Sequence, residues 1–186
     1  MTYLEGILVS SDGHVNTAAM GARIQGDTLH ARVFIPSDTA RNLGKNHRFT
    51  FSLTADPELF FKGALTGHDS PGEPELEEDE MVSTDGFYYP KKASKVHFCH
   101  ITSIIKRTVR DEYGRGELLD VTASILRVQG DERFIGREHP LVDVMVHLSR
   151  YSMVGEEQKR VMEARVKELS SDPTGKKIME WMESQP

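Results

Sequence analysis

Residues 117–128 read Glu-Leu-Leu-Asp-Val-Thr-Ala-Ser-Ile-Leu-Arg-Val, and their alternation decides the fold class. Leu119, Val121, Ala123 and Ile125 fall on one side of the chain if it is extended, and polar residues lie between them. A period of two residues is typical of a half-buried β-strand rather than of a helix. This stretch therefore predicts a strand with one face against an apolar core.

The same signals extend outward from this strand. Residues 96–109 form a matching arm, and the intervening turn Tyr113-Gly-Arg-Gly116 predicts a long hairpin. Nearer the N-terminus, apolar runs separated by turn residues predict strands at residues 4–10, 14–21, 29–35 and 47–53. The first hundred residues are thus expected to be mainly β-structure.

Helical periodicity dominates the last third of the chain. Leu141, Val144, Met145 and Leu148 recur at i, i+3, i+4 and i+7 and predict a helix over about residues 140–153. Further helices are expected at residues 37–44, 57–65, 156–169 and from Pro173 onward. The prediction is an α+β fold, with a barrel or sandwich of six or more strands over residues 1–130 and a helical subdomain over residues 131–186.

Residues 68–85 differ sharply from the rest of the chain. They contain eight acidic residues and no Lys or Arg. Like charges with few apolar residues cannot offset the entropy lost on ordering. A mobile surface loop is therefore expected within the strand region.

Composition excludes several functional classes. The 29 acidic and 23 basic side chains give a net charge of -6, which disfavours non-specific binding to nucleic acid. The single cysteine, Cys99, rules out an intramolecular disulfide framework and fits a reducing compartment. Neither a membrane span nor a signal peptide is evident. We expect a cytoplasmic protein that binds neither nucleic acid nor membrane.

Two stretches suit a ligand. Residues 16–21 read Asn-Thr-Ala-Ala-Met-Gly, and such small side chains would let a flat ligand lie against the strand backbone. The alternative is a strand packed tightly under a neighbour. Residues 37–43 read Ser-Asp-Thr-Ala-Arg-Asn-Leu, which places hydroxyls, a helix N-terminus and Arg41 together and suits a phosphate. The alternative there is a capped helix without a ligand.

Two clusters contain residue types that bind metals: His97-Phe-Cys-His100, and the stripe His139, Asp143, His147 and Arg150. On a strand, the first brings only His97 and Cys99 to one face, which is too few ligands for a structural zinc site. The stripe could bind a metal or line a pocket, but a solvated or subunit-facing stripe is favoured. No metal site is predicted.

Together, Glu5-Gly-Ile7, Asp12-Gly13 and the two ligand stretches resemble the flavin reductase-like, FMN-binding split barrels. The resemblance is to an uncharacterised, mainly archaeal family of that superfamily. Its members have a Glu-Gly-Ile opening, an Asn-x-Ala-Pro-x-Gly strand and a later helix with His, an acid and Arg, here His139, Asp143 and Arg150. Ala19 stands where many relatives carry proline.

The resemblance implies a homodimeric split β-barrel that binds FMN near the subunit interface, with Phe60, Phe61 and Trp181 as apolar surface. The implied cofactor-binding residues are Asn16, Thr17, Ala18, Met20 and Gly21 beside the ring, and Ser37, Asp38, Thr39 and Asn42 at the phosphate. The implied function is a flavin reductase-like redox protein that uses NAD(P)H. The alternative is a non-catalytic, dimeric flavin-binding or interaction protein. No catalytic side chain is assigned, because the flavin itself carries the electron chemistry.

Overall fold

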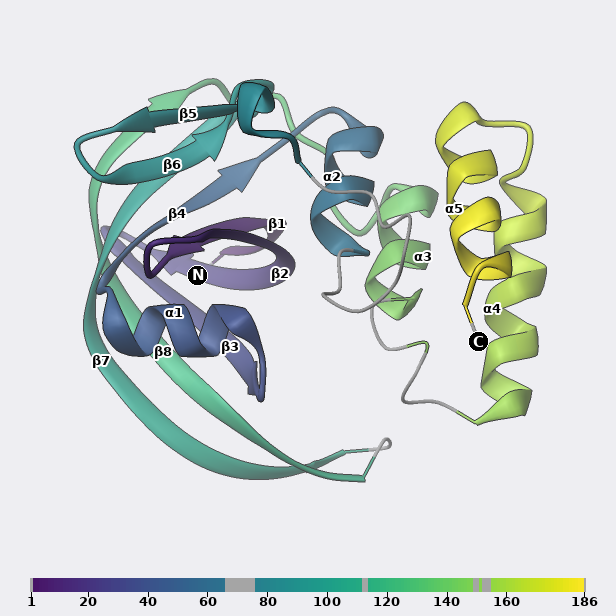
Figure 1. Ribbon diagram of the computed structural model, residues 1–186, viewed down its shortest axis with the longest axis horizontal. Coiled ribbons are helices and arrows are strands. Elements are labelled where there is room, and N and C mark those ends of the chain that lie inside the picture. Colours follow the sequence, from purple (N-terminus) through teal and green to yellow (C-terminus); the bar gives the residue numbers. More distant parts are fainter. Residues whose placement is uncertain (1, 66–75, 112–113, 149–150, 152–154, 186) are drawn as a thin grey trace.

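A computed structural model describes residues 2–65, 76–111, 114–148, 151 and 155–185 (Figure 1). Six strands close into an antiparallel barrel in the order β1-β2-β3-β8-β7-β4. Their bounds are β1 Thr2–Ser11, β2 Val15–Gln25, β3 Thr28–Ile35, β4 Arg48–Leu53, β7 Lys95–Asp111 and β8 Gly114–Gly130. The predicted barrel is therefore confirmed.

Strand β8 shows the predicted alternation. Val121 and Ala123 are buried in the barrel, and Leu119 and Ile125 pack against the same side chains. The strand pairs with β3 on one edge and with β7 on the other. Two register shifts interrupt the β7–β8 pairing, and such bulges increase the local twist. The long hairpin accordingly curves around the barrel (Figure 1).

The barrel encloses its own apolar cluster, called here the barrel core. Its buried members are Leu8, Ala22, Leu29, Ala31, Val33, Ala40, Leu43, Phe49, Phe51, Leu53, Cys99, Ile101, Val121 and Ala123. Two of these, Ala40 and Leu43, come from helix α1 (Asp38–Lys45). The helix is thus anchored to the barrel by its apolar face.

The other helices gather on one side of the barrel (Figure 1). They are α2 (Pro57–Ala64), α3 (Pro140–Leu148), α4 (Glu156–Glu168) and α5 (Pro173–Glu183). Asp172 caps α5 as its sequence indicates, with Oδ1 accepting from the Thr174 N–H at 2.8 Å. The predicted end of α3 near residue 153 lies outside the described residues. Within the described part of the chain, no helix is both long and apolar enough to cross a bilayer.

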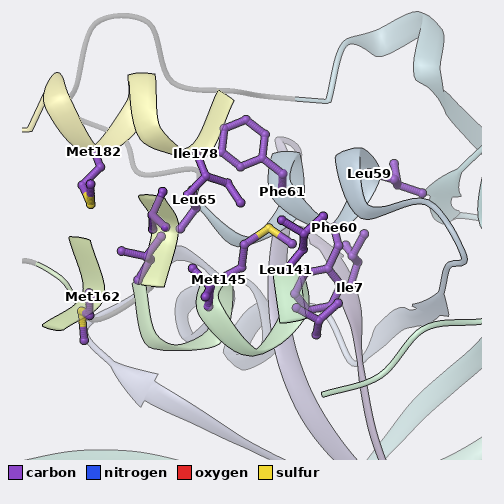
Figure 2. Close-up of a cluster of buried hydrophobic side chains, with 14 of the residues drawn as sticks. Ile7, Leu59, Phe60, Phe61, Leu65, Leu141, Met145, Met162, Ile178 and Met182 are labelled. Atoms are coloured by element: carbon purple, nitrogen blue, oxygen red, sulfur yellow. The ribbon is translucent and has the colours of Figure 1, made fainter. Parts of the chain in front are cut away.

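These helices form a second apolar cluster with the outer face of β1, called here the helix core (Figure 2). It contains Ile7 and Val9 of β1, together with buried residues of α2 to α5. Phe60 and Phe61 are 0% and 5% exposed within it, so the expectation that they form apolar surface was wrong. The helices share a core with β1. The division into a domain of residues 1–130 and a helical subdomain of residues 131–186 stays a prediction.

The expected loop at residues 68–85 was wrong over its second half, whereas residues 66–75 lie outside the described structure. A 3₁₀ turn, η1 (Glu78–Glu80), leads into a hairpin of β5 (Met81–Thr84) and β6 (Phe87–Pro90). Asp85 and Gly86 form its turn with φ of 51° and 77°, as a tight hairpin requires. Phe87 packs on Val96 and Phe98, an apolar contact that anchors the hairpin to β7.

Candidate functional site

Strand β2 is covered by β1 along one edge but only partly covered along the other. Strand β1 pairs with residues 15–24 of β2. Strand β3 pairs only with residues 22–25 before it continues along β8. Within the described residues, residues 15–21 therefore have no strand on their second edge. An uncovered edge presents backbone N–H and C=O groups, and we call this stretch the open edge of β2.

The open edge begins beside the N-terminus of α1. The Asn16 side-chain amide donates to Thr39 Oγ1 at 2.8 Å and joins the strand to the first turn of the helix. Ser37 caps the helix, because its hydroxyl oxygen accepts from the Ala40 N–H at 3.1 Å. The two stretches that the sequence indicated for ring and phosphate are thus adjacent.

A cleft of about 630 Å³ opens at the N-terminus of α1. It is lined by Ile35, Pro36, Ser37, Asp38, Ala40, Arg41 and Leu119. The positive end of the helix dipole and the Arg41 guanidinium both favour an anion here. Arg41 forms an ion pair with Asp38, however, so part of its charge is already neutralised.

The predicted phosphate residues separate into two pairs. Ser37 and Asp38 line the cleft, whereas Thr39 and Asn42 are each only 3% exposed. The Asn42 amide lies 3.4 Å from Ser10 Oγ on β1, and Thr39 contacts Asn16 on β2. Thr39 and Asn42 therefore hold α1 against the barrel. Their direct contact with a phosphate stays a prediction.

The predicted ring residues all lie on the open edge, and each is half-buried. Met20 packs against the barrel core, and Ala19 packs against the helix core. Successive side chains thus point to opposite, occupied faces of β2, as in any strand. A ligand at the open edge would therefore contact mainly the backbone of Asn16, Thr17, Ala18 and Gly21.

Glu5, opposite the far end of the open edge, was quoted in the sequence only as part of the Glu5-Gly-Ile7 motif and was not predicted as a site residue. Glu5 lies opposite Gly21 in the register of β1 and β2 and is 4% exposed. Burial raises the pKa of Glu5, although its hydrogen bond with Tyr3 and the charge of Arg137 act in the opposite direction. Within the described residues, Glu5 Oε1 has no hydrogen-bond partner. The available signal was a carboxylate inside an otherwise apolar strand.

The His97 cluster belongs to the barrel wall. His97 Nδ1 lies 3.2 Å from the Phe51 carbonyl oxygen, and burial lowers the pKa of this imidazole. Cys99 is part of the barrel core, where burial raises the pKa of its thiol to about 12. His100 is exposed. The described residues contain no group of three or more His, Cys, Asp or Glu that could hold a metal ion.

The stripe on α3 joins neighbouring segments to one another. Asp143 Oδ1 lies 3.1 Å from Arg137 Nε, and Asp143 Oδ2 lies 3.5 Å from Arg165 Nη1 on α4. His147 Nε2 lies 3.7 Å from the same carboxylate. Arg150 lies outside the described residues. Asp143 therefore links α3 to α4 and to the segment before α3.

Comparisons with known proteins show the family and the fold of the chain. The model of a family described as "Protein of unknown function (DUF447) N-terminal domain" matches residues 4–129. The chain belongs to this family. The matched part of the DUF447 chain ends one residue before the end of β8, so it covers the barrel but not α3, α4 or α5.

Several solved structures of other proteins share the fold of this chain. An FMN-bound DUF447 protein from Methanosarcina mazei is 22% identical, with a TM-score of 0.70, over 96% of this chain and 92% of its own. Flavoredoxin from Methanosarcina acetivorans is 13% identical over 72% of both chains, with a TM-score of 0.52. An NADH:FAD oxidoreductase from Streptomyces globisporus is 10% identical over 73% of this chain and 80% of its own, with a TM-score of 0.56. The predicted flavin reductase-like fold is confirmed.

Proposed function

We propose that this DUF447 protein binds FMN along the open edge of β2, with the phosphate at the N-terminus of α1. The observation that carries the proposal is the continuity of these two features. Asn16 joins them through its 2.8 Å hydrogen bond to Thr39. Residues 16–21 then extend for about 16 Å at roughly 3.3 Å per residue, a length that suits an extended mononucleotide. The related protein from M. mazei is described as FMN-bound.

The donor set of the chain fits this cofactor at both ends. The α1 N-terminus, Ser37 and Arg41 offer a single compact anion site, which favours FMN over FAD. Small residues at positions 17 and 18 leave the backbone of the open edge accessible to a flat ring. Beyond them, Glu5 supplies a buried oxygen without a partner among the described residues.

When bound, FMN supplies the electron-transfer chemistry of such a site. The residues of this chain bind and orient it. The Thr39–Asn16 and Asn42–Ser10 contacts hold α1 at a constant position relative to β1 and β2. The use of NAD(P)H as reductant is part of the proposal and rests on a shared fold with an NADH:FAD oxidoreductase.

We also infer a homodimer. Because Phe60 and Phe61 are buried, we propose the β7–β8 hairpin as its apolar surface instead. Ile105, Leu126 and Val128 on the β7–β8 hairpin are 50%, 60% and 48% exposed. Such side chains on a curved hairpin are suited to a subunit contact. Light scattering during gel filtration should return about twice the 21.0 kDa chain mass, and a mass of one chain would contradict the dimer.

Calorimetric titration with FMN and FAD tests the function. We expect FMN to bind more tightly, and Thr39→Asp to weaken FMN binding strongly. Two like charges about 4 Å apart repel by about 4 kcal/mol at an effective dielectric constant near 20. Thr39→Asn is the matched control, because it has nearly the same shape as Thr39→Asp without the charge. Anaerobic NADH and NADPH oxidation by the FMN-loaded protein would then separate the reductase from a non-catalytic flavin carrier.

Two outcomes would contradict this assignment. Absence of heat with FMN would exclude the cofactor. Equal FMN affinity of folded Thr39→Asp and Thr39→Asn would place the phosphate elsewhere. Circular dichroism of both variants shows whether each is folded, which matters because Thr39 is 3% exposed.

A further inference from the structure

Glu5 has an unusual environment for a carboxylate. It lies on the face of β1 that is directed towards the helices, two residues before Ile7 of the helix core, and is 4% exposed. Among the described residues, its Oε1 accepts no hydrogen bond. A buried polar atom without a partner is costly, and native proteins retain few of them. The Glu5 oxygen is therefore a candidate for a ligand's donor group.

The register places Glu5 on β1 directly opposite Gly21, the last residue of the open edge of β2. Glu5 pairs with Gly21, whereas Asn16 at the other end contacts the α1 turn. A Cβ atom on Gly21 would collide with the Tyr3 hydroxyl, so the absence of a side chain makes room for Tyr3. Tyr3 is 54% exposed. Its side chain is hydrogen-bonded to Glu5 and covers Gly21, so a ligand that reaches Glu5 would displace the Tyr3 ring.

Arg137 is a charged group that acts on Glu5 through space, and its side chain is fixed by Asp143. The Arg137 guanidinium is close enough to Glu5 to lower the pKa of its carboxyl, against the dominant effect of burial. Arg137 forms an ion pair with Asp143, in which Asp143 Oδ1 lies 3.1 Å from Arg137 Nε. Glu5 and Arg137 thus combine an acceptor with several N–H donors, a pairing that suits a ligand edge with an N–H beside a carbonyl.

We propose that Glu5 and Arg137 form the subsite for the cyclic imide edge of the flavin ring, where Glu5 accepts from the ring N3–H and Arg137 donates to the neighbouring carbonyl. This assignment rests on the proposed FMN function. It follows from position, because a ring whose phosphate lies at α1 reaches the Gly21 end of the open edge. The Arg137 charge would also stabilise electron density on that carbonyl, one of the ways a protein tunes a flavin.

The test compares FMN with its N3-methylated analogue, which keeps the phosphate but lacks the N3–H. Calorimetry on the wild-type protein should show at least about tenfold weaker binding of the analogue, since a hydrogen bond to a charged group is lost. Glu5→Leu should weaken FMN by a similar factor and bind both ligands equally. Glu5→Gln should retain part of the discrimination, because its carbonyl still accepts.

The matched control is Glu132→Leu, which removes a carboxylate that is 83% exposed and pairs with Lys95 away from the open edge. It should discriminate between the ligands as the wild type does. Equal wild-type affinity for both ligands would overturn the subsite and leave FMN binding intact, and the wild-type comparison needs no variant to fold. Failure of the wild type to bind FMN would overturn the proposed function and the subsite together.

Discussion

The barrel core and the helix core meet at β1 but are built in different ways. Leu8 points into the barrel core, whereas Ile7 and Val9 point into the helix core. Around the barrel core, each strand is hydrogen-bonded to a neighbour on both sides over part of its length. The helix core is joined to the barrel by side-chain packing on β1 (Figure 2).

The two cores also differ in composition. Met145, Met162 and Met182 are buried in the helix core, whereas the buried residues described for the barrel core include no methionine. Methionine is unbranched and adapts to irregular gaps, whereas the barrel strands are also fixed by hydrogen bonds to neighbouring strands. We infer that the barrel is the rigid support of the phosphate end of the site. The helix layer would then be the more adaptable part of the site, next to Glu5.

The largest expected effect comes from damage to the barrel core. Phe51 is 0% exposed, and Phe51→Ala should lower the free energy of unfolding by about 3–5 kcal/mol. Urea denaturation followed by circular dichroism would measure this. FMN binding should fall with the folded fraction. The matched control is Phe34→Ala on β3, where Phe34 is 38% exposed and the loss should be much smaller. Equal losses would contradict a closely packed barrel core.

A second prediction separates the two cores. Ile178 of α5 is 0% exposed in the helix core, and Ile178→Ala should destabilise the helices by about 2–5 kcal/mol. Native-state hydrogen exchange should then show amides of α4 and α5 exchanging faster while those of β8 keep their protection. Val161→Ala on α4, at a position that is 55% exposed, is the control. Equal acceleration in β8 would show that both cores unfold as one unit.

The smallest expected effect is on the stability of the fold at acidic pH. Lys177 of α5 and Glu58 of α2 form an ion pair with Nζ and Oε1 2.5 Å apart. That hydrogen bond lowers the pKa of Glu58 from its usual 4.5, so the pair stabilises the fold above pH 4.5 and loses this effect as pH falls further. Because both side chains are nearly half exposed, the gain is at most about 1 kcal/mol.

Lys177→Met tests the sign of this effect. The variant should be slightly less stable than wild type at pH 7, and the difference should shrink towards pH 3, as measured by thermal unfolding. Glu5 provides the opposite case. Burial raises its pKa, so its ionisation opposes folding as pH rises above 4.5, and Glu5→Gln should remove that dependence. A Lys177→Met difference that grows on acidification would exclude the ion-pair explanation.

Local patterns allowed much of the fold to be predicted. The alternation in residues 117–128 indicated β8, and Asp172 before Pro173 indicated the start of α5. The hairpin at Asp85–Gly86 was missed although Asp-Gly is a strong turn signal, because the count of acidic residues was given more weight. Phe87 is buried against Phe98, with ring centroids 5.4 Å apart. The number of acidic residues in the segment does not reveal this contact.

The sequence by itself determined most of the element types, the family and the two stretches that lie at the candidate site. Each depends on residues close together in the chain, where hydrogen bonding and side-chain periodicity act locally. Only the tertiary structure decided that β3 pairs with residues 22–25 of β2 and not with residues 15–21. It also decided that the Thr39 side chain is buried and that Glu5 pairs with Gly21. These features depend on pairing between distant segments, whose register is selected by the packing of the whole barrel rather than by any one stretch.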